Sequence, residues 1–161
     1  VKNIPLLIDA YEKVRLKYPE YILYLIGDGQ DKDKIREYVR EKGLSDFVVF
    51  TGMLANPFSY IKQANVLCLS SESEAYPTVL LEALAFGKTI VATPTKGAIE
   101  ILEKGRLGYL SVDFSVDEYY KTLIKGIEQP IEESYLKNEV KKSDVGMVTN
   151  NLVEIFNEVM K

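Results

Sequence analysis

Short apolar runs alternate with stretches of helical spacing along most of this chain, and no other feature constrains the fold as strongly. The apolar runs are rich in β-branched and aromatic residues, which predicts strands at 21–27, 47–50, 65–70, 88–93 and, more weakly, 108–112. Apolar residues at helical spacing predict helices at 4–16, 32–41, 57–63, 78–86 and 98–102. Such alternation is typical of parallel βαβ units, so we expect an α/β domain: a Rossmann-like parallel sheet flanked by helices.

The chain reaches its first helix almost at once. Asn3 is a candidate N-cap and Pro5 falls in the first turn, both typical of a helix start. A series of βα units that opens with a helix suggests that the first strand of the sheet is missing. Towards the other end, residues 115–127 and 145–161 predict two further helices around a polar segment, 128–144, in which no strand is expected.

Composition narrows the class of protein. The 161 residues are 47% hydrophobic and 27% charged, as in a single globular domain, and no apolar run reaches the ~20 residues of a membrane span. We therefore expect a cytoplasmic protein.

The formal net charge of −4 argues against nucleic acid as a partner. The chain has no histidine, which excludes Ser-His and Cys-His catalysis and most transition-metal sites, and the lone Cys68 is expected to pack in the core.

Two carboxylates stand out because of their surroundings. Glu82 is the only charge in the apolar helix expected at 78–86, so it needs partners: Lys or Arg side chains, or the hydroxyls of a ligand. Glu74 follows the strand expected at 65–70, on the side where parallel sheets bind ligands. The amides that open the next helix are donors suited to an anion such as phosphate. This loop offers an acid, the aromatic ring of Tyr76 and an anion site.

The segment SSESEAYPTVLLEALAFGKTIVAT resembles the Glu-x7-Glu signature of the retaining, nucleotide-sugar-dependent glycosyltransferases of group 1 (family 4). That signature belongs to the C-terminal half of the two-domain GT-B fold. Other motifs match in order: VKNIPLLIDAYEKV resembles the family's Lys-Asn helix, YLIGDG its second strand and Gly-rich turn, and VVFTGML its next strand and loop. GAIEIL and GYL stand in the places of its Gly-Pro-Glu and Gly-(Tyr/Phe)-Leu elements. The resemblance covers residues 2–112.

The resemblance implies a role for each residue that matches a family motif. Glu74, the first glutamate of the signature, would contact the donor sugar, and Glu82, the second, would accept hydrogen bonds from the nucleotide ribose. Lys2 matches the lysine that neutralises the leaving group, so the expected catalytic residues are Glu74 and Lys2. The other expected donor-binding residues are Tyr76 in the same loop, Thr78 and Val79 through their amides to the diphosphate, and Gly27, Gly52 and Met53 around the nucleotide.

By the same resemblance, residues 1–161 would form a single donor-binding domain, inactive in isolation, of a larger enzyme that transfers a sugar to an acceptor hydroxyl. The partners implied are a nucleotide sugar and a glycan, lipid or small-molecule acceptor held by an absent N-terminal domain. That absent domain could place the enzyme at the inner face of a membrane. No metal or other cofactor is implied. Two alternatives stay open: a non-catalytic nucleotide-binding partner subunit, and a sugar-nucleotide epimerase, against which the absence of histidine counts.

The same residues allow simpler interpretations. Glu82 could form a salt bridge within the core, Glu74 could be a solvated loop acid, and Lys2 could extend into solvent. The Asp-x-Asp spelling at 31–33 occurs elsewhere in metal-nucleotide sites, but it opens a helix here, so capping is expected. Pro77 stands where many family members have glycine, and it removes one backbone donor.

Overall fold

The fold is seen in a computed structural model that describes residues 2–142 and 146–159. Its helices and strands follow one another in the order α1 (Ile4–Lys17), β1 (Leu23–Ile26), α2 (Lys32–Glu41), β2 (Val48–Gly52), α3 (Phe58–Gln63), β3 (Val66–Leu69), α4 (Thr78–Ala85), β4 (Thr89–Ala92), α5 (Lys96–Ile101), η1 (Glu103–Gly105), β5 (Tyr109–Leu110), α6 (Val116–Glu128), α7 (Glu133–Lys141) and α8 (Gly146–Val159). Strands and helices alternate from α1 to α6, so the predicted α/β class with parallel strands flanked by helices is confirmed.

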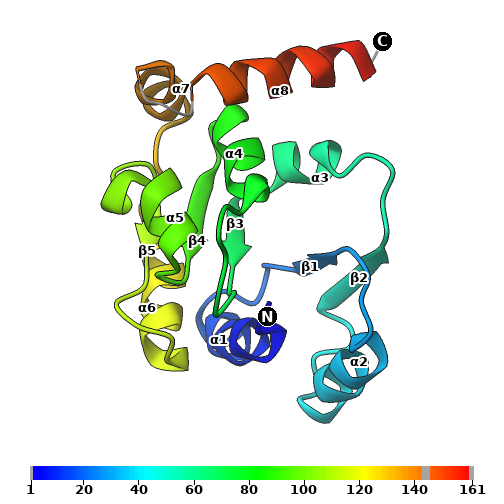
Figure 1. The fold of residues 1–161 in the computed structure, drawn as a ribbon. Helices are drawn as coiled ribbons and strands as arrows, with labels where there is room; N and C mark the ends of the chain where they lie inside the picture. The colour runs from blue at the N-terminus through cyan, green and yellow to red at the C-terminus, as the bar shows by residue number, and fades with distance from the viewer. Residues whose placement is uncertain (1, 143–145, 160–161) are drawn as a thin grey trace.

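The strands form two parallel groups. β1 pairs with β2, and β3, β4 and β5 pair in that order, with Val66 opposite Thr89 and Val91 opposite Tyr109. Within the described residues no ladder joins β1 to β3, so the single sheet expected from the sequence is divided. Figure 1 shows the division: β1 and β2 lie with α2 on one side, and β3, β4 and β5 on the other.

The strands pack against two hydrophobic cores, and the second of these includes residues from both groups of strands. Around β3 to β5 the core is built from α4, α5 and α7, with side chains such as Leu80, Ile90 and Leu107 inaccessible to solvent. The second core lies around α1, whose Ile8 is fully buried, and α1 packs against α6. Cys68 packs against this second core as expected, and burial raises the pKa of its thiol to about 12.

The start of α1 confirms two expectations, and the start of α2 confirms one in part. The Asn3 side chain accepts a hydrogen bond from the Leu6 amide at 3.4 Å, and Pro5 lies in the first turn. Asp31 occupies the N-cap position of α2, but its side chain makes no capping hydrogen bond. Its carboxylate pairs with Lys34 at 3.1 Å. The predicted position of the acid at the helix start is confirmed, but it makes no side-chain capping bond there.

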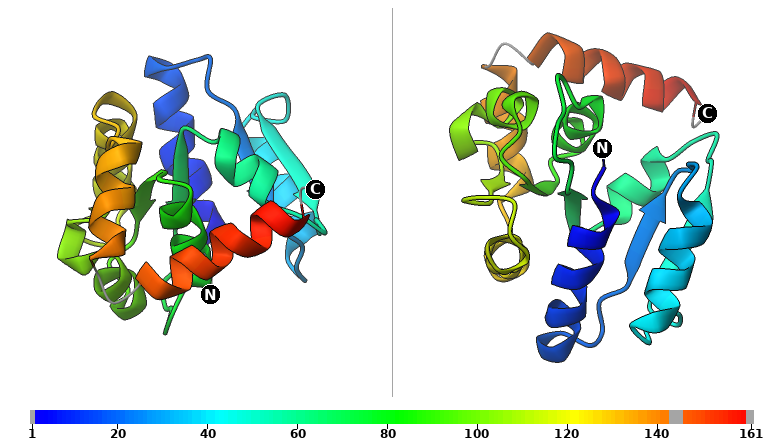
Figure 2. Two further views of the ribbon diagram at one scale, coloured as in Figure 1. Left: turned by 90° about the horizontal axis from the view of Figure 1, so that it is seen from above. Right: turned by 60° about the horizontal axis from the view of Figure 1, so that its bottom comes forward.

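Helix α7 lies in the segment that the sequence analysis described only as polar. Its apolar face is narrow, because Leu136 and Val140, one turn apart, are its buried residues. The remaining positions are mostly charged or polar and hide the helical period. Helix α8 lies along one side of the domain, where it contacts α4 and α7 (Figure 2). Val145 and residues 160–161 of the predicted C-terminal helix lie outside the described residues.

Across the ranges 2–142 and 146–159, no helix is both long enough and apolar enough to cross a bilayer.

Candidate functional site

The loop between β3 and α4, residues 70–77, carries the first of the two conspicuous carboxylates. Two hydrogen bonds tie it to the segment after β4, one from the connection to α5 and one from the first turn of α5. The Thr93 hydroxyl donates to the Ser71 carbonyl at 2.5 Å, and the Gly97 amide donates to the Glu74 carbonyl at 3.2 Å. The loop is therefore fixed against the carboxyl ends of β3 and β4, where open parallel sheets bind ligands.

Gly97 permits the close approach of this loop to α5. A Cβ atom at position 97 would lie 2.5 Å from the Ala75 carbonyl oxygen and 2.6 Å from the Cδ atom of Pro77. Both contacts are shorter than real Cβ atoms make, and both involve backbone or a rigid ring. A larger residue at position 97 must therefore displace the loop or the helix.

We predict that Gly97→Ala lowers the free energy of unfolding by about 1–3 kcal/mol, the usual cost of overpacking, and that it also weakens nucleotide binding. Urea denaturation and calorimetry measure the two effects. Gly29→Ala is the matched control, because a Cβ at position 29 meets nothing within 4 Å and the backbone there is not left-handed. Equal stability of the two variants would contradict the close-packing argument.

Lys2 and Glu74, the two residues expected to be catalytic, form an ion pair with 2.6 Å between the Lys2 Nζ and the Glu74 Oε1 atoms. Ser71 donates a second hydrogen bond to the same Oε1 atom at 2.8 Å, and Ser70 donates to the Lys2 carbonyl at 2.9 Å. The Glu74 side chain is 19% exposed and that of Lys2 65%. The Lys2 ammonium group, with help from Ser71, holds the pKa of Glu74 below its usual value, so this carboxyl is ionised at neutral pH.

The first turn of α4 follows directly. Pro77 is its N-cap and makes no side-chain cap, and the Leu80 amide already donates to the Pro77 carbonyl at 3.0 Å. Among the described residues, no acceptor is paired with the amides of Thr78 and Val79. Two free amides at the positive end of a helix can bind an anion, and the ion pair with Glu74 holds the Lys2 ammonium against the loop that leads into this helix.

Glu82 lies one turn after Thr78, so the two side chains share one face of α4. It is partly buried, and burial raises the pKa of its carboxyl. Neither an ion pair nor a hydrogen bond reaches it from residues 2–142 and 146–159, so the salt-bridge interpretation is not supported there. No fully buried polar side-chain atom in this part of the chain lacks a partner, so both unpartnered oxygens of Glu82 retain some accessible surface. An acceptor pair of this kind can take the two hydroxyls of a diol.

Gly27 and Gly52, predicted near the nucleotide, lie at the ends of β1 and β2. The Gly27 amide donates to the Gly52 carbonyl at 3.0 Å, and both residues have left-handed φ angles, 117° and 69°. Glycine is favoured there because a side chain would strain the backbone. The side chains of Met53 and Tyr76 are exposed, so a ligand can contact them. No recorded contact joins this glycine pair to Lys2 or Glu74 within the described residues.

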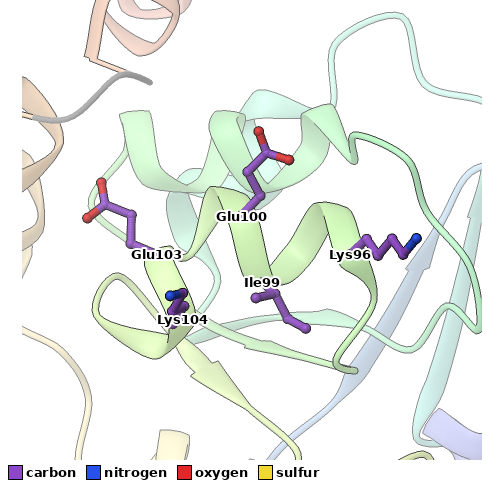
Figure 3. Close-up of a pocket in the computed structure, with 5 residues that line it drawn as sticks. All are labelled: Lys96, Ile99, Glu100, Glu103 and Lys104. Carbon is purple, nitrogen blue, oxygen red and sulfur yellow. The ribbon is translucent and has the colours of Figure 1, made fainter.

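A hollow of about 450 Å³ lies elsewhere, on the surface of α5 and η1. It is lined by Lys96, Ile99, Glu100, Glu103 and Lys104, and Figure 3 shows these side chains pointing in different directions. None of the residues predicted for the site lines it. Because its charged groups do not converge on one point, we assign no ligand to it.

The hydroxyl groups around the ion pair were not predicted. Ser70, Ser71 and Thr93 are buried polar residues at the carboxyl ends of β3 and β4. The sequence gives only a weak signal for them, namely a hydroxyl residue directly after each apolar strand run. A hydroxyl residue in that position is equally typical of the start of a loop.

Comparison with known proteins adds independent evidence. Residues 1–143 match the family model of glycosyl transferases group 1. An uncharacterized glycosyltransferase of Methanocaldococcus jannaschii is 36% identical over 97 residues, which are 60% of this chain and 24% of that protein. The N-acetyl-alpha-D-glucosaminyl L-malate synthase of Bacillus anthracis is 31% identical over 110 residues, 68% of this chain and 29% of that enzyme.

Among solved structures, Anabaena HepE in complex with UDP superimposes with a TM-score of 0.77 at 24% identity, over 98% of this chain and 45% of the HepE chain. Likeness at that identity shows the fold, which is that of one domain of a GT-B glycosyltransferase. The chain spans about a quarter of the length of the two relatives named above. Since the family model covers most of the sequence, the chain belongs to the glycosyl transferases group 1 family.

Proposed function

We propose that this domain binds a nucleotide-diphosphate sugar and forms the C-terminal half of a retaining family 4 glycosyltransferase, which transfers the sugar to an acceptor hydroxyl. The observation that carries the proposal is the ion pair between Lys2 and Glu74 beside the two unpaired amides that open α4. The UDP held by HepE and the glycosyltransferase names of the relatives support it. The acceptor in this proposal is a glycan, a lipid or a small molecule.

In this proposal different residues contact the diphosphate and the sugar of the donor. The amides of Thr78 and Val79 bind the diphosphate, and Lys2 neutralises the negative charge that grows on it as the bond to the anomeric carbon breaks. Such groups stabilise the transition state most if they are already in place, and the fixed loop between β3 and α4 provides that. Glu74 contacts the sugar, and the acceptor oxygen forms its bond on the face that the diphosphate leaves.

Glu82 binds the ribose in this proposal. Its partly buried carboxylate has no partner among the described residues, and a ribose diol supplies two hydroxyl donors to it. Burying the charge of Glu82 costs free energy in the empty domain, and the hydrogen bonds from the ribose offset this cost in the complex. Glu82 therefore favours a ligand that carries a sugar diol next to a diphosphate.

The divided sheet supports a larger enzyme. Between the two groups of strands lies a hollow of about 420 Å³ that both β1 and Asn65, just before β3, help to line. In the described part of the chain β1 pairs only with β2 and β3 only with β4, so each of the two strands leaves one edge of backbone hydrogen-bonding groups unpaired. We propose that one further strand fits between β1 and β3, and that an acceptor-binding domain completes the site.

The domain alone is therefore expected to bind a nucleoside diphosphate weakly and to transfer no sugar, because a site between two domains is half formed in one of them. Calorimetry with uridine, guanosine and adenosine diphosphates measures binding, and a transfer assay with nucleotide sugars measures turnover. Binding of none of the three would contradict the donor-site proposal. Turnover by residues 1–161 alone would contradict the two-domain proposal, and binding without turnover by the longer enzyme would favour a non-catalytic partner subunit.

A further inference from the structure

Three hydroxyl side chains are buried beneath the ion pair of Lys2 and Glu74. Ser70 is 3% exposed, and Ser71 and Thr93 are 0% exposed. Buried hydroxyls are costly unless they are hydrogen-bonded, and each of these donates to a named acceptor. Thr93 donates to the Ser71 carbonyl, Ser71 to the Glu74 carboxylate, and Ser70 to the Lys2 carbonyl.

The two oxygens of Glu74 have different surroundings. Lys2 and Ser71 both donate to Oε1, at 2.6 and 2.8 Å. Across the described residues no donor is recorded for Oε2, and the same part of the chain holds no fully buried side-chain oxygen without a partner. Oε2 therefore keeps accessible surface and is the oxygen open to a ligand.

Ser71 fixes this arrangement better than Lys2 can. The Lys2 side chain is 65% exposed and has four rotatable bonds, so its ammonium can follow the carboxylate to many positions. Ser71 has one rotatable bond to its hydroxyl, it is inaccessible to solvent, and its own carbonyl is held by Thr93 at 2.5 Å. The direction of the Glu74 carboxylate is therefore set by a short, immobile donor.

We propose that Ser71 is a positioning residue of the transfer reaction: its hydroxyl holds Oε1 of Glu74 so that Oε2 faces the donor sugar. Thr93 supports Ser71 from β4. This inference rests on the proposed function, because it assigns the open oxygen of Glu74 to the sugar. The lowered pKa of Glu74, to which the Ser71 hydrogen bond contributes, agrees with the geometry.

Ser71→Ala in the intact enzyme tests the proposal. We expect kcat to fall about tenfold, while the Kd for the bare nucleoside diphosphate, which lacks the sugar, changes less than twofold. Ser111→Ala is the matched control: Ser111 is buried like Ser71, at 3% exposed, and donates to the backbone carbonyl of Asp113, but it makes no hydrogen bond to Lys2 or Glu74. The control should leave kcat unchanged and lower the melting temperature as much as Ser71→Ala does.

A double-mutant cycle separates positioning from folding. In a Glu74→Gln background, Ser71→Ala should change kcat much less than it does alone, because the group that it positions is already altered. If Ser71→Ala does not fold, Thr93→Val, which is nearly isosteric, should give the same selective loss of kcat. Equal losses in kcat from Ser71→Ala and Ser111→Ala, or full additivity with Glu74→Gln, would overturn the inference.

The two levels of the proposal fail differently. If Glu74→Gln itself leaves turnover unchanged, the proposed role of Glu74 on the sugar fails, and the role of Ser71 fails with it. If Glu74→Gln lowers turnover and Ser71→Ala does not, only the positioning role is wrong.

Discussion

Glu82→Gln is expected to weaken nucleoside diphosphate binding about ten- to a hundredfold, because hydrogen bonds to charged groups contribute roughly 1.5–3 kcal/mol. The amide keeps one acceptor oxygen but loses the charge and one acceptor for the ribose diol. Calorimetry on the wild type and the variant gives the ratio of dissociation constants. Glu100→Gln is a suitable control, since Glu100 lies on α5 and lines the separate hollow there.

The same substitution is expected to stabilise the empty domain, which gives the test a second readout. Burial raises the folded-state pKa of Glu82, so the folded state binds this proton more tightly than the unfolded state does. The protonated Glu82 carboxyl therefore makes its full contribution to stability below the unfolded-state pKa, and this contribution is lost as the pH rises through the folded-state pKa. Glu82→Gln removes that loss, so the variant should be the more stable one at neutral pH, and the difference should shrink on acidification through the carboxylate range.

If the Glu82→Gln variant is more stable than the wild type without ligand but binds the nucleotide more weakly, Glu82 serves ligand binding and not the stability of the fold. A structural salt bridge predicts the reverse for stability, because Glu82→Gln would then leave a cation unpaired. A variant that is less stable and binds the nucleotide normally would contradict the assignment of Glu82 to the ribose.

Glu74→Gln is expected to lower kcat of the intact enzyme about ten- to a hundredfold with little loss of nucleoside diphosphate affinity. The sugar loses a charged hydrogen-bond acceptor, whereas the bare diphosphate makes no contact with this side chain. The substitution also releases the Lys2 ammonium from its 2.6 Å ion pair, so diphosphate affinity should be unchanged or slightly higher. Steady-state kinetics and calorimetry on the same preparations separate the two effects.

Lys2→Met provides the complementary variant, since it removes the charge proposed to neutralise the leaving group and keeps a flexible side chain. It should lower both the diphosphate affinity and kcat. If Glu74→Gln weakened diphosphate binding while Glu82→Gln left it intact, the roles of the two glutamates would be exchanged.

Most of the fold could be predicted from the pattern of the sequence. The parallel strands at 66–69 and 89–92 are short, mainly apolar runs bounded by polar residues, and this pattern predicts strands. Helix α7 was missed because only Leu136 and Val140 are buried on it, too few to produce a visible period. Asp31 was placed correctly at the start of α2, but its carboxylate pairs with Lys34 instead of capping the helix, and sequence alone does not show which partner is chosen.

The candidate site divides in the same way. Glu82 was recognisable because it is the only charge among apolar neighbours, and Glu74 because its spacing from Glu82 matches a family signature. The contact between Lys2 and Glu74 spans 72 positions and depends on how α1 lies beside the loop after β3, which no local pattern specifies. The roles of the buried hydroxyls and of Gly97 could not be predicted either, because each depends on a contact with a neighbouring strand, loop or helix.

The most direct test of the central claim, that a nucleotide diphosphate binds at the start of α4, is an NMR titration of the ¹⁵N-labelled domain with uridine, guanosine and adenosine diphosphates. The account predicts that, with at least one of them, the largest backbone shifts fall on the amides of Thr78 and Val79, with further shifts at Gly27 and Gly52. In the proposed complex the amides of Thr78 and Val79 bind the diphosphate, and Gly27 and Gly52 lie beside the nucleotide. Shifts confined to the α5 surface around Lys96 and Glu103, or no shifts with any of the three, would contradict it.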